Sequence, residues 1–359
     1  MMENEVMCVF TDILLNHYNK YPLMREQDFI KLIYQSEFGS HFNIEVDQAV
    51  SYLMAECQDI KPEKTELMTD IGCGLVRVNL AEYMRRGLSL QLLGAIFARS
   101  STRSTATTES LENKFNCLMD LCERKMINIS PNSMLSTIEK FKRDIRPVSH
   151  TASYAKNYHP HYRVVKKAMM LMMDCIQAIE DIQSGNVLVC IEGNSGSGKS
   201  YYASVIKDYF GSRCNVFSTD DFFLPRLSKT PQRLAEIGGN VDYERLHDLI
   251  ANIQQGEEIS YKQFSCATQS YSICKLAPAE INIIEGVYSA HPTLIKEYDL
   301  VIRLTVDKLT QQRRIFERDG KQILELYNNE WLPLENKYLD NLDYHGKKVI
   351  EIDTSNTAR

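Results

Sequence analysis

The chain contains 359 residues, of which 44% are hydrophobic and 25% are charged, as in ordinary globular proteins with a proper core. Its length predicts two domains. The net charge of −6 gives no support for nucleic acid or a membrane as a partner. None of the ten cysteines lies in a CxxC pair, which indicates reduced thiols. The chain begins without a signal peptide and contains no membrane-spanning run, so a cytoplasmic protein is expected.

Residues 1–160 are predicted to form a mainly α-helical N-terminal domain, whose role the sequence does not indicate. The segment 26–38 has helical periodicity and places residues such as Phe29 and Ile33 on one apolar stripe. Residues 75–80 alternate apolar and polar side chains, which predicts a short strand or hairpin.

The end of this region carries an unusual cluster of basic residues, HPHYRVVKK at 159–167. His159 and His161 have a spacing that could bind a metal, but no third ligand is evident. Arg163 could contact a phosphate or an acceptor molecule, although a surface segment at a helix start is favoured. A long helix is predicted over 164–182, where apolar residues again follow helical spacing.

Residues 161–359 are predicted to form an α/β domain with a five-stranded parallel sheet. Short, continuous apolar runs are typical of buried parallel strands, and helical stretches separate them. The expected strands are 187–191, 216–218, 281–284, 300–304 and 349–352. The expected helices are 199–210, 243–255, 308–319 and 321–330.

The first of these strands leads into GNSGSGKS, which matches the phosphate-binding loop G-x-x-x-x-G-K-[ST] in full. Glycines allow backbone N–H groups to converge on an anion at the start of the next helix. Lys199 is expected to contact the β- and γ-phosphates of ATP or another nucleoside triphosphate, and Ser200 to bind Mg²⁺. A chance turn, or a loop that binds nucleotide without catalysis, is the alternative. The predicted nucleotide-binding residues are Gly193, Asn194, Ser195, Gly196, Ser197, Gly198, Lys199, Ser200 and Tyr201.

Two adjacent carboxylates, Asp220 and Asp221, follow the second strand. Ligands of open parallel sheets bind at the carboxyl ends of the strands. A carboxylate there could accept a proton from a hydroxyl that attacks the γ-phosphate. The alternative is that both side chains cap or solvate a turn.

Several ordered motifs of the C-terminal region resemble the uridine kinase and phosphoribulokinase group, which includes bacterial pantothenate kinase. Besides the loop at 193–200, these motifs are STDDFF (218–223), NVDYERL (240–246), INIIEGVYS (281–289) and RRIFERDG (313–320). The resemblance implies a P-loop kinase domain that phosphorylates a hydroxyl of a small metabolite. The whole chain is also similar to two-domain bacterial proteins described as uridine-kinase-like, in YQSEFGSHF (34–42) and NYHPHYRVV (157–165).

On the acceptor side, the resemblance implies that Asp220 is the base and lies near the metal. Phe223 would line the acceptor pocket, and Asp242 would bind acceptor hydroxyls, although Asp242 could instead cap the helix that follows. Tyr261 matches a substrate-binding tyrosine, but Cys266 stands where uridine kinases have a base-contacting histidine. Uridine itself is therefore doubtful as the acceptor.

On the donor side, the resemblance implies that Glu285 helps Ser200 and Asp220 to hold Mg²⁺. Arg314 and Arg318 match lid arginines that neutralise charge in the transition state, with a solvated helix face as the alternative. Together with Lys199 and Asp220 they form the predicted catalytic set.

The predicted function is an ATP- and Mg²⁺-dependent kinase with a nucleoside-like or sugar-like acceptor. A pantothenate-type or glycerate-type kinase is the rival enzyme. The rival from another class is a nucleotide-binding regulatory switch that does not turn over a metabolite. A homo-oligomer is left open.

Overall fold

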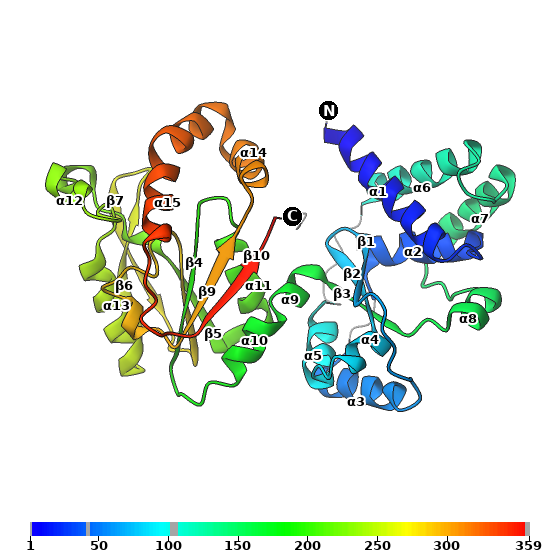
Figure 1. Cartoon of the computed structure of the whole chain (residues 1–359), viewed down its shortest axis with the longest axis horizontal. Helices are drawn as coiled ribbons and strands as arrows, with labels where there is room; N and C mark the ends of the chain where they lie inside the picture. Colours follow the sequence, from blue (N-terminus) through cyan, green and yellow to red (C-terminus); the bar gives the residue numbers. More distant parts are fainter. Residues whose placement is uncertain (1, 41–43, 101–106, 356–359) are drawn as a thin grey trace. The chain divides into compact units, whose positions relative to one another are not determined.

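The computed structural model describes residues 2–40, 44–100 and 107–355. The chain divides into two compact units, Met1–Met170 and Leu171–Ala358. Each unit is described by itself (Figure 1).

The N-terminal unit combines helices with a small antiparallel sheet of strand order β1-β2-β3. Its core joins apolar side chains of several helices to strand β1. The elements are α1 (Met2–Lys20), α2 (Glu26–Phe38), α3 (Val46–Cys57), β1 (Met68–Gly72), β2 (Leu75–Asn79), α4 (Leu80–Arg85), α5 (Leu90–Ser100), α6 (Thr108–Glu123), α7 (Pro131–Arg143), α8 (Ala152–Tyr158) and β3 (Tyr162–Lys166).

Two predictions for this unit are confirmed, and one is wrong. Phe29 and Ile33 of α2 are fully buried, and β1 and β2 form a hairpin around the alternating segment. The long helix predicted over 164–182 instead begins as strand β3, in which Val165 pairs with Val76 of β2. A short apolar run fits a strand or a helix equally well, and here the pairing with β2 decides. Helices α9 (Lys167–Leu171) and α10 (Met173–Glu180) follow.

The second unit is the predicted α/β domain with a five-stranded parallel sheet, of strand order β10-β9-β4-β8-β5. The five strands expected from the apolar runs are all present, each within two residues of its predicted start and end. They are β4 (Val187–Gly193), β5 (Cys214–Ser218), β8 (Ile281–Glu285), β9 (Leu300–Thr305) and β10 (Val349–Asp353).

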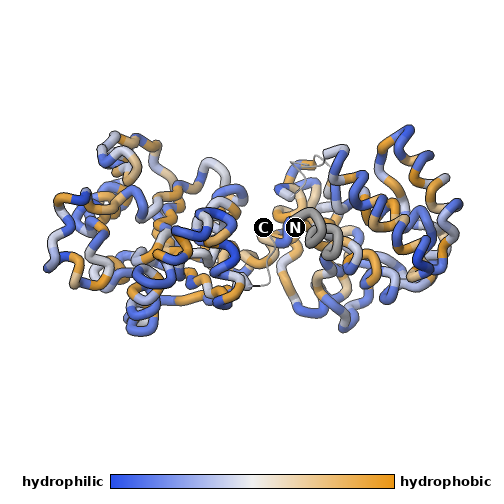
Figure 2. The backbone as a smooth tube through the Cα atoms, turned by 90° about the horizontal axis from the view of Figure 1, so that it is seen from above, coloured by the Kyte–Doolittle hydropathy of each residue, from blue (hydrophilic) through white to orange (hydrophobic). Residues whose placement is uncertain are grey.

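Helices cover both faces of this sheet (Figure 1). Helix α11 packs on β4, β5 and β8 on the face where α10 contacts β9, whereas α13 and α15 contribute to the core on the other face. Figure 2 shows hydrophobic and hydrophilic segments alternating along the backbone of this unit. The remaining elements are α11 (Lys199–Phe210), α12 (Pro231–Ala235), α13 (Tyr243–Gln255), α14 (Lys308–Leu326), the π-helical turn η5 (Tyr327–Trp331) and α15 (Leu332–Asp340), with the 3₁₀ turns η1 (Gly211–Arg213), η2 (Thr219–Phe222), η3 (Arg226–Ser228) and η4 (Ile295–Glu297).

In this unit one further prediction is confirmed, and one pair of strands was missed. The predicted break between the last two helices is confirmed, because α14 contains Gly320 with φ +80°, outside the helical region. The hairpin of β6 (Ile259–Ser265) and β7 (Ser270–Leu276) was not predicted. Most of its side chains are exposed or half-buried, so its sequence lacks the regular apolar alternation that marks a strand.

None of the described helices has both the length and the apolar character needed to cross a membrane. The cysteines whose side chains are described are all free thiols.

Gly286, directly after β8, should be the least replaceable glycine near the sheet edge. It has φ +147°, and a Cβ there would lie 1.7 Å from Oγ1 of Thr219 in η2. We expect Gly286→Ala to lower the free energy of unfolding by about 3 kcal/mol, since a buried clash adds to backbone strain. Urea unfolding followed by fluorescence of Trp331, the single tryptophan, measures this.

Gly211→Ala is the matched control, because Gly211 also has positive φ but a Cβ there would meet nothing within 4 Å. It should cost only about 1 kcal/mol. Equal losses for the two variants would show that the contact with Thr219 does not constrain this edge.

Candidate active site

The phosphate-binding loop lies at the carboxyl end of β4, in the middle of the sheet. Strand β4 ends at Gly193, and α11 begins at Lys199. A Cβ on Gly193 would lie 2.3 Å from the carbonyl oxygen of Leu304 in β9, so only glycine lets the two backbones approach this closely. The strand, loop and helix that the motif requires are therefore all present.

Lys199 is the buried cation of this loop. Its Nζ donates hydrogen bonds to the carbonyl oxygens of Gly193, at 2.9 Å, and Asn194, at 3.0 Å. Only 9% of the residue is exposed. The ammonium group is thus held against the loop, where phosphate oxygens could replace the carbonyls as its partners.

Arg314, predicted as a lid arginine, lies buried beneath the loop. Its guanidinium donates to the carbonyl oxygen of Gly196, at 3.1 Å, and to both the hydroxyl and the carbonyl of Thr354. The Thr354 hydroxyl in turn donates to the carbonyl of Ser197. In this arrangement Arg314 positions the loop backbone, and its catalytic role stays a prediction.

A carboxylate that the sequence analysis did not single out also contacts the loop. Glu335 of α15 accepts hydrogen bonds from the backbone N–H of Ser195, at 2.8 Å, and from its hydroxyl, at 2.7 Å. The neighbouring Asn336 accepts from the side chain of Asn194. Burial raises the pKa of Glu335, opposed by the bonds from Ser195 and the charge of Lys199. No sequence motif marks this contact, because the partners are 140 residues apart.

Glu285 ends β8 beside the loop, as predicted. Strand register places it opposite Ile191 of β4 on one side and Ser218 of β5 on the other. Its Oε1 accepts a hydrogen bond from the Ser200 hydroxyl at 3.0 Å. Burial raises the pKa of Glu285, while the positive charge of Lys199 and hydrogen bonds from Ser200 and Ser218 act in the opposite direction.

Asp220 lies at the start of η2, just past the end of β5. The surrounding protein raises the pKa of its carboxyl; Lys199 and, more weakly, Arg318 oppose this, while Asp221 adds to it. The residue is nevertheless exposed to water, so this effect is weaker than it would be for a sealed carboxyl. The charge of Asp220 adds to the raised pKa of Glu285, and the positive charge of Lys199 lowers the pKa of both carboxyl groups. Loop, base candidate and metal-ligand candidate therefore converge at one edge.

The donor set at this edge fits Mg²⁺. Mg²⁺ prefers oxygen ligands and is commonly held by one or two carboxylates together with substrate phosphates and water. The Ser200 hydroxyl and the Glu285 carboxylate are in direct contact, and Asp220 lies within electrostatic reach of both Glu285 and Lys199. Two carboxyl groups whose pKa is raised would both be stabilised as anions by a divalent cation.

Asp221 is not part of the proposed metal site. Its side chain instead contacts the neighbouring hairpin. Its two carboxylate oxygens accept hydrogen bonds from the Tyr261 hydroxyl, at 3.1 Å, and the Gln263 amide, at 2.9 Å. The ring of Tyr261 also stacks on Phe222. Asp221 therefore holds η2 against β6, whereas the Asp220 carboxylate makes no such contact with any described residue.

Two of the predicted acceptor residues, Asp242 and Phe223, contact one arginine, Arg245 of α13. Asp242 caps α13 by accepting from the backbone N–H of Arg245, and it pairs with the Arg245 guanidinium at 2.7 Å. The same guanidinium donates to the carbonyl of Phe223. The capping alternative for Asp242 is thus observed, while its contact with an acceptor stays a prediction. Cys266 is exposed at the turn between β6 and β7.

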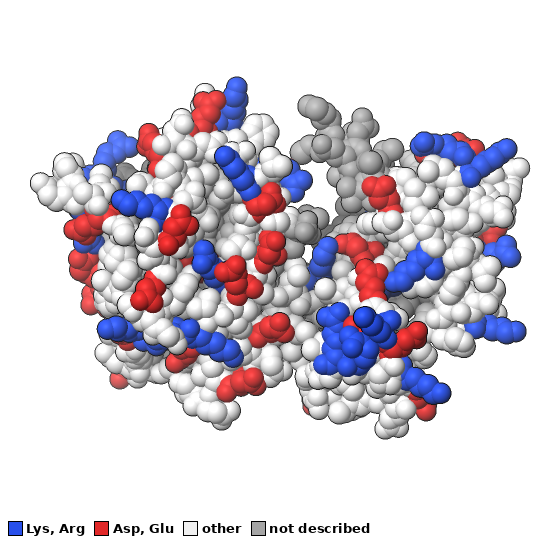
Figure 3. Space-filling view, viewed as in Figure 1, with Lys and Arg blue, Asp and Glu red and all other residues white. Residues whose placement is uncertain are grey.

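The other predicted residues lie at the surface. Arg318 of α14 pairs with Asp319 at 2.7 Å and donates to the Tyr327 hydroxyl at 3.0 Å. Tyr327 also meets Trp331 edge to face, and Trp331 is 39% exposed, so it is not a fully buried core residue. Tyr201 follows the loop on α11 and is 41% exposed. Figure 3 shows acidic and basic side chains interspersed on the visible face of this unit.

The chain is similar in sequence to several known proteins. Uridine kinases of Bacillus thuringiensis, Bacillus cereus and Bacillus anthracis are each 25% identical to it over 172 residues, covering 43% of this chain and 80% of the relative. This similarity confirms the resemblance to uridine-kinase-type P-loop proteins that the motifs indicated. No protein-family model matches the chain.

Solved structures are also similar to part of the chain. A possible uridine kinase from Bacillus stearothermophilus aligns with a TM-score of 0.36 and 18% identity, covering 50% of this chain and 97% of the other. A D-glycerate 3-kinase from Cryptococcus neoformans aligns with a TM-score of 0.38 and 12% identity, covering 52% of this chain and 93% of the other.

Glu285→Gln should make the second unit more stable at neutral pH. Because the pKa of Glu285 is higher in the folded than in the unfolded chain, the wild type loses stability as pH rises through that interval. The neutral amide avoids this loss and can still accept from Ser200. We expect the free energy of unfolding of the variant to exceed that of the wild type by about 1 kcal/mol at pH 8, and this difference to vanish at about pH 4. Urea unfolding followed by Trp331 fluorescence across this range measures it.

The control is Glu258→Gln, a glutamate whose side chain is 64% exposed and pairs with Lys275. Its effect should stay within about 0.5 kcal/mol at every pH. A gain for Glu285→Gln that did not depend on pH would contradict the assigned cause.

Proposed function

We propose that this uridine-kinase-like chain is a kinase that transfers the γ-phosphate of ATP, or of another nucleoside triphosphate, to a hydroxyl of a small nucleoside-like or sugar-like metabolite. The observation that carries the proposal is the convergence of Lys199, Asp220 and Glu285 at the carboxyl ends of β4, β5 and β8. A P-loop alone is compatible with many fates of the phosphate. A second carboxylate at this edge, Asp220, whose side chain has no hydrogen-bond or ion-pair partner among the described residues, favours transfer to an acceptor hydroxyl.

The donor is bound by the loop. Backbone N–H groups at the start of α11 and the Lys199 ammonium group surround the phosphates. Ser200 and Glu285 hold Mg²⁺, which supplies neutralisation of charge on the phosphate oxygens. Arg314 acts as a positioning residue, because its contacts with Gly196 and Thr354 fix the loop backbone.

The acceptor is activated from the opposite side. Asp220 accepts the proton of the attacking hydroxyl, and the raised pKa of its carboxyl brings it closer to the working pH of a general base. Arg318 already influences the charge of Asp220 and stabilises the charge that develops on the transferred group. Phe223 and Tyr261 line the side of η2 on which the acceptor binds. Asp242 binds acceptor hydroxyls only if it exchanges part of its contact with Arg245.

Asp220→Asn should lower kcat by about 10³-fold, because amides do not accept the proton, while the Kd for Mg²⁺-ATP stays within about threefold of the wild type. Coupled ADP release measures kcat, and calorimetry measures nucleotide binding.

Asp221→Asn is the matched control for this loss. It removes the same charge one residue away, but an amide oxygen can still accept a hydrogen bond from Tyr261 or Gln263. We expect a loss of kcat below about tenfold. If Asp220→Asn retained full activity, Asp220 would not be the base.

A metabolite panel tests the reaction itself. Purified protein with Mg²⁺-ATP is offered nucleosides, sugars, pantothenate and glycerate, and both ADP and the mass of the phosphorylated product are recorded. Acceptor-dependent ADP release is expected with at least one member of the nucleoside or sugar set. Turnover of pantothenate or glycerate alone would favour the rival kinases. Tight ATP binding without any acceptor-dependent release would favour the regulatory switch.

A further inference from the structure

The N-terminal unit contains a small polar cavity, which we name the Arg77 cavity. The residues that matter for its chemistry are His17, Arg77, Tyr154, Tyr158, His159 and Tyr162. Five consecutive residues of its wall, 158–162, belong to the YHPHY segment that the kinase site does not use. The cavity volume is about 50 Å³. This has room for roughly four water-sized groups, which is far too small for a nucleoside.

Arg77 is a buried cation that forms no ion pair with any residue that the structure describes. It lies on β2 with only 5% of its surface exposed. Its Nε and Nη2 donate to the neutral amide oxygen of Gln35, at 3.0 and 2.7 Å. The guanidinium also lies 4.6 Å from the centre of the Tyr162 ring. Neither contact supplies a negative charge, and a buried charge without a counter-charge is costly.

The two carboxylates whose charges act on His17 and Tyr154 of this wall are already engaged. Asp28 accepts from the backbone N–H and hydroxyl of Thr151 and contacts Nδ1 of His150. Asp70 pairs with Lys167 at 2.8 Å and accepts from the backbone N–H of Gly72. Among the described residues, therefore, no carboxylate forms an ion pair with Arg77.

His17 adds a second unsatisfied group to the same wall. It is 1% exposed, and its Nε2 lies 2.9 Å from the carbonyl oxygen of Asp70. A carbonyl only accepts, so Nε2 carries the proton. Burial, followed by the charge of Arg77, lowers the pKa of His17 to about 3, and the ring is neutral. Nδ1 is then an acceptor, and it has no partner within the described part of the chain.

Tyr154 contributes a hydroxyl donor. Its ring is 2% exposed and stacks on His150 at 4.0 Å between ring centres. No described group forms a hydrogen bond with its hydroxyl, although the Tyr162 hydroxyl contacts His150 and the Tyr158 hydroxyl accepts from Leu23. The cavity wall thus presents the Arg77 guanidinium and the Tyr154 hydroxyl to a space that is large enough for one small group.

We propose that the Arg77 cavity binds one small oxyanion, a phosphate or carboxylate group, with Arg77 as its counter-charge and Tyr154 as a hydrogen-bond donor. A guanidinium recognises such groups through paired N–H donors. A phosphate that keeps one proton would, in addition, offer a hydroxyl to an acceptor such as His17. This site does not depend on the proposed kinase function.

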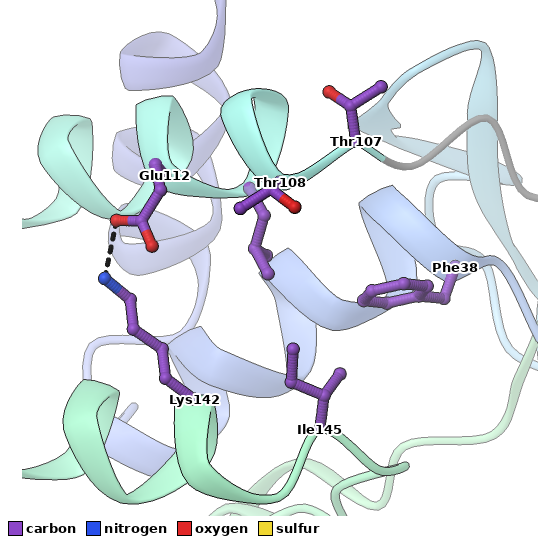
Figure 4. Close-up of a pocket in the computed structure, with 7 residues that line it drawn as sticks. Phe38, Thr107, Thr108, Glu112, Lys142 and Ile145 are labelled. Carbon is purple, nitrogen blue, oxygen red and sulfur yellow. Dashed lines mark hydrogen bonds and ion pairs between the residues drawn. The ribbon is translucent and has the colours of Figure 1, made fainter.

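The larger hollow of the same unit does not share these properties (Figure 4). Its volume is about 360 Å³, but Lys142 and Glu112 in its wall pair with each other at 2.5 Å. Its other lining residues include Phe38 and Ile145, so it presents no unpaired charge to a ligand.

The basic residue singled out from the sequence, Arg163, does not fill this role either. Its guanidinium pairs with Glu56, which also contacts His161 at 3.2 Å. In this region, Arg77 of the neighbouring strand β2 is therefore the residue that we expect to contact the anion. No sequence motif marked Arg77 in advance.

Calorimetric titration of the full chain with inorganic phosphate, sulfate and acetate tests the proposal. The P-loop is first saturated with Mg²⁺-ADP, because it would otherwise bind the same anions. We expect at least one anion to bind with one-site stoichiometry and a Kd below about 10 mM. Preference for phosphate identifies a phosphate group as the ligand chemistry, and preference for acetate a carboxylate. No binding of any of the three in this range would overturn the proposal.

Two variants and one matched control locate the site. Arg77→Gln should weaken binding of the preferred anion at least about tenfold, and Tyr154→Phe about threefold to tenfold. Arg163→Gln removes the same charge from the adjacent strand and should leave the affinity unchanged. If Arg77→Gln does not fold, as judged by circular dichroism, Tyr154→Phe decides. Unchanged affinity in Tyr154→Phe, or an equal loss in Arg163→Gln, would place the anion elsewhere.

Discussion

The catalytic edge of the second unit depends on one buried carboxylate, Glu192, the next-to-last residue of β4. It is fully buried and accepts hydrogen bonds from the backbone N–H groups of Gly193 and Ala290 and from the Tyr338 hydroxyl. Burial raises the pKa of Glu192, and these donors oppose the shift. Such a group is costly unless every lone pair is used. Glu192 thereby ties the start of the phosphate-binding loop to the turn after β8 and to α15.

This tie explains how distant segments are held around the loop. Once Tyr338 fixes α15, Glu335 on the same helix reaches Ser195. Below the loop, Arg314 holds the backbone of Gly196 in place by donating a hydrogen bond to its carbonyl oxygen. Burial raises the pKa of all four carboxyl groups, those of Glu192, Glu335, Asp220 and Glu285. Glu192 and Glu335 are each held by several hydrogen bonds and build the scaffold, whereas the carboxylate of Glu285 is held by hydroxyl groups of Ser200 and Ser218. Active sites commonly retain such unfavourable charges at some expense in stability.

The same physical criterion applies to the N-terminal unit. Arg77 is as deeply buried as the structural charges of the second unit, yet it faces a neutral amide and an aromatic ring. Lys114, by comparison, is buried beside Glu37 at 2.6 Å. A buried cation with its counter-ion is part of a core, and a buried cation without one beside a cavity indicates a ligand.

The sequence by itself determined the α/β domain, its five strands and the phosphate-binding loop, because buried parallel strands are continuous apolar runs and the loop needs residues at fixed spacing. It also separated Asp220 from Asp221 through the family resemblance, and the contacts of Asp221 with Tyr261 and Gln263 agree with a supporting role. Only the tertiary structure decided that β3 is a strand, that Arg314 lies under the loop and that Arg77 has no counter-ion among the described residues. Strand pairing and charge compensation join residues far apart in the chain, and local patterns carry no record of those partners.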